Sequence, residues 1–222
     1  MNISLILKPA IDLIAVFLLA FGIKGLSKVR SAREANRLAA IAMSLAVVGV
    51  LVNSIANGGI RLDAWLWILI GSFVGGLLGI FTAQRVPMTA MPETVALFNG
   101  CGGMSSLLVA LGVALFRGEN LSELSGVEIV KLISIVVSVF VGSITFTGSI
   151  VAMAKLQGWL STPPWTQSKV RHAVNIAFLI ICLIAILEFL LGGNNGLWLL
   201  IIGSGLLGVG VTLPIGGADM PV

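Results

Sequence analysis

Seven long apolar stretches, separated by short polar linkers, set the strongest constraint on how this chain of 222 residues folds. Each is long enough to cross about 30 Å of hydrocarbon as an α-helix, which rises about 1.5 Å per residue. A chain in lipid must pair its backbone groups internally, and no stretch alternates like the strands of a β-barrel. We therefore predict an all-α, polytopic helical bundle with spans at about 8–27, 35–56, 63–84, 91–116, 127–155, 171–191 and 196–213.

The composition agrees with a membrane protein. Hydrophobic residues make up 58% of the chain, charged residues 10%, and the mean hydropathy is +1.11. Soluble domains average about 45–50% apolar and about 25% charged residues. No linker has room for a soluble domain, so we predict a single transmembrane domain over residues 1–222. The first stretch precedes its basic residues, unlike a signal peptide, and is expected to be a retained span.

The lysines and arginines are concentrated in alternate linkers. Nine of them belong to the linkers after the first, third and fifth spans, and four belong to the other side. The positive-inside rule then predicts an N-terminus outside and a C-terminus in the cytoplasm. The net charge of +4 therefore reflects membrane topology and not a nucleic-acid surface. We expect a multi-pass protein of the cell (inner or plasma) membrane.

One face of the predicted span 127–155 is small and hydroxylated along nearly its whole length. At 100° per residue, its members fall within an arc of about 60°. Two explanations stay open, namely hydroxyls that bond to backbone or join helices, and a stripe that lines a hydrated path. The face consists of Lys131, Ser134, Ser138, Thr145, Ser149 and Ala152.

The segment MPETVALFNGCGG at 91–103 places an amide inside a predicted span. Pro92 and Glu93 suit the first turn of a helix, where no donor is lost and the dipole favours a carboxylate. Asn99 lies about 9 Å further along, on a face of small and polar residues. Its amide needs a hydrogen bond, either to another helix or to water in a path. Because an amide does not titrate at physiological pH, Asn99 can orient water but cannot carry a proton.

The remaining polar residues give secondary candidates. The only histidine, His172, is of a type that exchanges protons near neutral pH, but its place at the start of a span better suits an interfacial anchor. Asn175 lies one turn deeper on the same helix face as His172. Glu93 is the third secondary candidate. No metal-ligand spacing, nucleotide-binding loop or nucleophile motif occurs. We therefore expect no metal site and no catalytic residue in this chain.

Glycines recur inside two predicted spans. Gly71, Gly75 and Gly79 share one face of the third span, and Gly203, Gly205, Gly208 and Gly210 follow in the seventh. Small residues at this spacing let helix backbones approach closely in lipid. The pattern favours tight helix packing over a gating role.

Four motifs occur in order along the chain. They are GLSK at 25–28, MPETVALFNGCGG at 91–103, SITFTGS at 143–149 followed by VAMAKL at 151–156, and GGADMP at 216–221. Together they resemble the membrane part of the beta subunit of proton-translocating NAD(P) transhydrogenase, over essentially the whole chain. The resemblance implies a complex that transfers hydride from NADH to NADP⁺ while a proton crosses the membrane.

The resemblance also implies partners and cofactors. NAD would be bound by a domain of the alpha subunit and NADP by a cytoplasmic domain on the C-terminal side of this chain, so this chain would bind neither. The alpha subunit would add membrane helices, and the assembly would be a dimer of alpha–beta protomers. Because the family pattern continues past Val222 with two more spans and the NADP domain, we expect the chain to be a fragment.

The motifs assign roles residue by residue. By resemblance, Asn99 and Ser149 would line the proton path, which the hydroxylated face extends through Ser138 and Thr145. Some family members carry a histidine at the position of Asn99, and members with asparagine have an equivalent histidine on an alpha-subunit helix. We thus expect the titrating group on the partner chain. The loop that couples the path to the NADP domain would contain Gly216, Gly217 and Asp219.

Two other functions fit part of the pattern. A small secondary transporter or ion channel would predict inverted repeats with interrupted helices, and the two halves show no convincing repeat. A purely structural membrane anchor leaves the hydroxylated face unexplained.

Overall fold

The chain forms helices throughout, apart from short turns, in the parts that its computed structural model describes, which are residues 3–26, 31–56, 62–116, 126–167 and 169–215. The all-α prediction is confirmed, since these residues contain seven α-helices and no strand. The elements are α1 (Ile3–Leu26), α2 (Ala32–Ala56), α3 (Leu62–Arg85), η1 (Met88–Ala90), α4 (Met91–Leu115), α5 (Gly126–Leu156), η2 (Pro164–Gln167), α6 (Val170–Leu190) and α7 (Asn194–Thr212).

The helices reproduce the spans expected from the sequence. From α2 to α7, each begins and ends within three residues of the predicted bounds, and α1 begins five residues earlier. Six of them, α2 to α7, are long and apolar enough to cross a membrane, and the apolar part of α1 is Leu13–Gly22. That α1 spans the membrane, and which side each terminus faces, stay predictions.

The chain divides into two compact units, residues 1–83 and 84–222. In the first unit, α1 packs on α2 through small residues. A Cβ atom on Gly25 would lie 2.7 Å from the Cβ of Ala35, and one on Gly22 would lie 3.1 Å from that of Ala39. The hydroxyl of Ser31 donates to the carbonyl of Gly25 at 2.8 Å. Glycine thus permits the tight α1–α2 contact.

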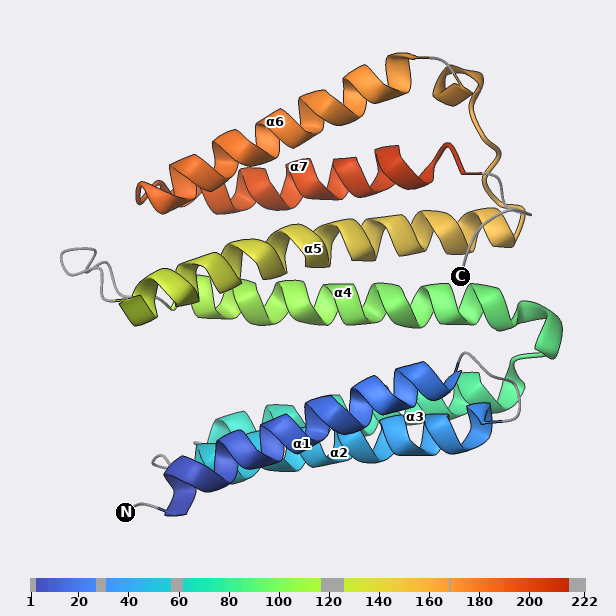
Figure 1. The fold of residues 1–222 in the computed structure, drawn as a ribbon. Coiled ribbons are helices and arrows are strands. Elements are labelled where there is room, and N and C mark those ends of the chain that lie inside the picture. The colour runs from blue at the N-terminus through green and yellow to red at the C-terminus, as the bar shows by residue number, and fades with distance from the viewer. Residues whose placement is uncertain (1–2, 27–30, 57–61, 117–125, 168, 216–222) are drawn as a thin grey trace. The chain divides into compact units, whose positions relative to one another are not determined.

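In the second unit, the helices lie side by side in the order α4, α5, α7, α6 (Figure 1). Neighbours in sequence are therefore neighbours in space for α4 and α5 and for α6 and α7, whereas α7 lies between α5 and α6. The linker at residues 157–169, with η2 packed on α6, makes this crossover possible. The completely buried residues of this unit's apolar core come from α5, α6 and α7, and they are Val139, Cys182, Ala185 and Leu200.

The backbones of α4 and α5 touch at a pair of glycines. A Cβ atom on Gly103 would lie 2.8 Å from the carbonyl oxygen of Gly142, and one on Gly142 would lie 2.8 Å from the carbonyl oxygen of Gly103. Real Cβ atoms do not approach backbone oxygens so closely. Only glycine therefore permits this crossing, in the manner of small-residue contacts in lipid.

The tight packing predicted for the glycines of α7 is confirmed. A Cβ atom on Gly203 would lie 3.1 Å from the sulfur of Cys182 in α6, and one on Gly208 would lie 2.6 Å from the carbonyl oxygen of Ile144 in α5. In α3 the outcome differs, because no described atom lies within 4 Å of a Cβ placed on Gly71, Gly75 or Gly79. These α3 glycines have no packing role within the described residues.

Replacing Gly103 with alanine should therefore destabilise the protein. The added methyl group must push α4 away from α5, and overpacking of this kind costs about 1–3 kcal/mol. The matched control is Gly102→Ala, since a Cβ there meets nothing within 4 Å. The free energy of unfolding of the purified protein, from detergent titration in micelles, should fall for Gly103→Ala and hold for Gly102→Ala. Equal values for the two variants would contradict the contact.

Candidate functional site

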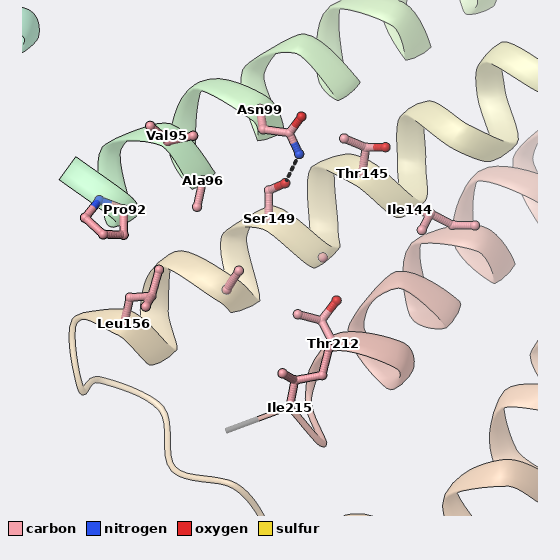
Figure 2. Close-up of a pocket in the computed structure, with 12 residues that line it drawn as sticks. Pro92, Val95, Ala96, Asn99, Ile144, Thr145, Ser149, Leu156, Thr212 and Ile215 are labelled. Carbon is pink, nitrogen blue, oxygen red and sulfur yellow. Dashed lines mark hydrogen bonds between the residues drawn. The ribbon is translucent and has the colours of Figure 1, made fainter. Parts of the chain in front are cut away.

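A cleft of about 480 Å³ opens between the first half of α4, the second half of α5 and the end of α7. Figure 2 shows side chains of all three helices around it. It combines polar and apolar walls within three helices that are long and apolar enough to cross a membrane. The lining residues are Pro92, Val95, Ala96, Asn99, Ile144, Thr145, Gly148, Ser149, Ala152, Leu156, Thr212 and Ile215.

Asn99 and Ser149 form the polar centre of this cleft. The amide nitrogen of Asn99 donates to the hydroxyl of Ser149 at 2.9 Å, as the dashed line in Figure 2 marks. Gly100 allows this contact, because a Cβ there would lie 3.1 Å from the Cβ of Ser149. Ser149 is buried, whereas Asn99 is exposed within its own unit, residues 84–222. The cleft is thus closed behind the serine and open beside the asparagine.

The chemistry available to the cleft is hydrogen bonding without titration. Its polar side chains are amides and hydroxyls, and none of its lining residues is ionisable. Such groups bind and orient water or another chain's side chain, but they do not titrate at physiological pH. Across the described residues, no group of three or more His, Cys, Asp or Glu side chains is placed to hold a metal ion.

The predicted hydroxylated face of α5 is divided between two clefts. Thr145 and Ser149 line the first, and Ser138 lines a second cleft of about 350 Å³ on the same α4–α5 seam. The contact of Gly103 with Gly142 lies between the two clefts along both helices. The second cleft is lined by Ser105, Ser106, Val109, Ala110, Val113, Lys131, Ser134, Ile135 and Ser138.

Some hydroxyls serve the helices themselves. Ser134 donates to the carbonyl of Val130 at 2.7 Å, within α5. Thr147 donates to the carbonyl of Ser143 at 3.0 Å and to that of Gly205 in α7 at 2.8 Å. Backbone bonding therefore accounts for Ser134, and a hydrated path along the rest of the face stays a prediction.

The secondary candidates do not line the first cleft. Glu93 lies in the first turn of α4, beside Pro92, as predicted. His172 is exposed at the start of α6, where its Nε2 accepts from the Nε of Arg171 at 3.2 Å. Asn175 donates to the carbonyl of Gly210 at 3.3 Å and so joins α6 to α7. The predicted coupling residues Gly216, Gly217 and Asp219 lie outside the described residues.

Lys155 borders the cleft and was not among the predicted site residues. Its ammonium donates to the hydroxyl of Thr162 at 2.8 Å, to the carbonyl of Ile215 at 2.6 Å and to the carbonyl of Leu213. The side chain is only 5% exposed. In the sequence, Lys155 is one of the basic residues at the end of a predicted span. No regular spacing along the chain relates it to residues 213–215. Only the packing of α5 against α7 reveals these contacts.

Comparison with known proteins gives a consistent result. The family model for the NAD(P) transhydrogenase beta subunit matches residues 8–222. The chain is 32% identical over 219 residues to a protein named NAD(P) transhydrogenase subunit beta from Rhodospirillum rubrum, and equally to its counterpart from a named strain of that species. The aligned part is 97% of this chain and 46% of each relative, so the chain spans about half the length of these relatives.

The Asn99–Ser149 bond should appear as a coupling energy between the two side chains. Interhelical hydrogen bonds in membrane proteins average about 0.6 kcal/mol in double-mutant cycles and reach about 1.7 kcal/mol. We expect a value in this range when Asn99→Ala and Ser149→Ala are combined and unfolding is measured in micelles. The control cycle pairs Asn99→Ala with Ser138→Ala, whose side chains line different clefts and should not couple. Zero coupling in the first cycle would contradict the bond.

Proposed function

Because the chain belongs to the family of NAD(P) transhydrogenase beta subunits, as its four motifs predicted, we propose that it is the proton-translocating membrane part of such an enzyme. Its matched family and its apolar helices identify it as a multi-pass membrane protein. In the proposed enzyme, proton transfer across the membrane drives hydride transfer from NADH to NADP⁺. NAD and NADP are bound by other domains of the complex, where the hydride-transfer site also lies.

The observation that carries this proposal is the polar cleft on α4, α5 and α7. Leaving an amide in hydrocarbon costs several kcal/mol, about 4–8 kcal/mol on a cyclohexane scale. One hydrogen bond to Ser149 satisfies only one of the groups on the exposed Asn99 amide. The remaining groups of the amide need water or a polar helix as a partner, and either suits a proton path.

The roles within the path follow from the chemistry of its walls. Asn99, Thr145 and Ser149 orient water or a partner side chain by hydrogen bonds, and Ser138 does so in the second cleft. None of them titrates, and the family resemblance assigns the proton carrier to a histidine on the alpha subunit's membrane helices. The contact of Gly103 with Gly142 separates the two clefts.

Coupling to the nucleotides takes place at the C-terminal side of this chain. By the resemblance of their motif, Gly216, Gly217 and Asp219 are assigned to coupling with the NADP-binding domain on the cytoplasmic side. In this proposal the path has two conformations, and the proton binds one of them more tightly. Proton binding then changes the affinity of the NADP-binding domain for NADP(H), and NADP(H) binding changes the affinity for the proton, because coupling between sites is reciprocal. The assembly is a dimer of alpha–beta protomers, with the NAD-binding domain on the alpha subunit.

Asn99→Leu should abolish proton-coupled turnover while the complex still assembles. Leucine has a similar size but can neither donate to Ser149 nor hold water in the cleft. The measurement is NADPH formation driven by a proton gradient in proteoliposomes that contain the whole complex. Cys101→Leu is the control, because Cys101 is on α4 but does not line either cleft. Undiminished gradient-driven turnover in Asn99→Leu would remove Asn99 from the path.

Asp219→Asn should change the affinity for NADP(H), or its release rate, without preventing assembly. The amide keeps the shape of the side chain and removes the charge on which the coupling loop relies. The release rate of NADP(H) from the purified complex, followed across pH, is the measurement. A release rate equal to that of the parent enzyme at every pH would exclude Asp219 from coupling.

A further inference from the structure

The C-terminal end of α7 is held by a cation from another helix. The last carbonyls of a helix have no partner within the helix and need one from elsewhere. A glycine in the left-handed conformation, one residue after the C-cap, often closes the end of a helix. Here the C-cap residue is Leu213, which keeps helical angles, with φ −58° and ψ −35°. Here the carbonyls of Leu213 and Ile215 instead accept from the ammonium of Lys155 in α5.

The geometry of Lys155 differs from that of a lysine at a membrane surface. Such a lysine extends its ammonium into water, whereas Lys155 turns inward and is 5% exposed. An ammonium has three N–H donors, and the described acceptors are three in number, the third being the hydroxyl of Thr162. All three acceptors are neutral. A buried cation that is fully hydrogen-bonded is costly to displace, so its partners are held in one arrangement.

These contacts tie together three segments that are distant in sequence. Lys155 belongs to the last turn of α5, Thr162 to the α5–α6 linker, and Leu213 and Ile215 to the turn that follows α7. The same region borders the first cleft, because Ile215 and Leu156, the residue after Lys155, line it. The lysine therefore sets the position of one wall of the cleft.

The same residue also sets where the chain leaves α7. Gly216 follows Ile215 directly, and Asp219 lies three residues after Gly216. A movement of the α7 end changes both the cleft wall and the starting point of this segment. The cleft and the segment are thus joined through a single ammonium group.

We propose that Lys155 is a positioning residue for coupling, which holds the turn after α7 so that the wall of the cleft and the point at which the chain leaves α7 move together. This inference rests on the proposed function. Lys155 touches neither nucleotide nor the reacting atoms and acts only through α7. Its loss should therefore reduce the coupling of proton transfer to NADP(H) release and spare the hydride step itself.

The test uses the whole complex with Lys155→Met, which keeps the length of the side chain and removes its donors, and Lys155→Arg, which keeps charge and donors. Misplacement of a supporting group costs about 10- to 100-fold in rate, so gradient-driven NADPH formation should fall by that factor in Lys155→Met. Single-turnover hydride transfer with both nucleotides bound should change less than about twofold. Lys155→Arg should recover most of the gradient-driven rate.

Two results would overturn the inference. One is a parent-like gradient-driven rate in assembled Lys155→Met, and the other is an equal loss in the gradient-driven and single-turnover measurements, which indicates general damage. If Lys155→Met does not assemble, Thr162→Val decides, because it removes one acceptor and leaves the cation. A selective loss of about twofold or more in the gradient-driven rate supports the inference, and no loss overturns it. A parent complex without gradient-driven transhydrogenation would instead refute the proposed function.

Discussion

The close approach of α4 to α5 at Gly103 and Gly142 is the contact on which the candidate site depends. The two backbones touch there, since each added Cβ would lie 2.8 Å from the opposite carbonyl oxygen. In lipid, where apolar burial hardly drives helices together, such contacts supply much of the attraction. The same contact brings Asn99 within hydrogen-bonding distance of Ser149 and leaves a cleft on either side of the crossing.

At this site, a tight helix contact lies beside an asparagine amide that has one hydrogen bond, to Ser149. Ser149 is buried between helices, and Asn99 remains exposed within this chain. A polar side chain inside a span is stable only where protein or water completes its hydrogen bonds. Within residues 84–215, Ser149 supplies one such bond to the Asn99 amide. The proposed division of labour, with the proton carrier on the alpha subunit, agrees with this incompleteness.

Most of the fold could be predicted from the sequence, and only part of the site. Helix bounds followed from apolar length, because hydrocarbon thickness sets the length of a span. Asn99, Thr145 and Ser149 were expected on polar faces, and they do line one cleft. Ser138 shares the α5 face but lines the second cleft, because periodicity places residues around a helix and does not show where a neighbouring backbone interrupts the seam.

The sequence alone determined that the chain is helical, where its helices begin and end, and which family it belongs to. These properties depend on local hydrophobicity and on short motifs. Tertiary structure decided that α7 lies between α5 and α6, that two clefts form instead of one stripe, and that Lys155 turns inward to the end of α7. Such contacts join residues about 60 positions apart, and no local pattern encodes which surfaces of two helices will meet.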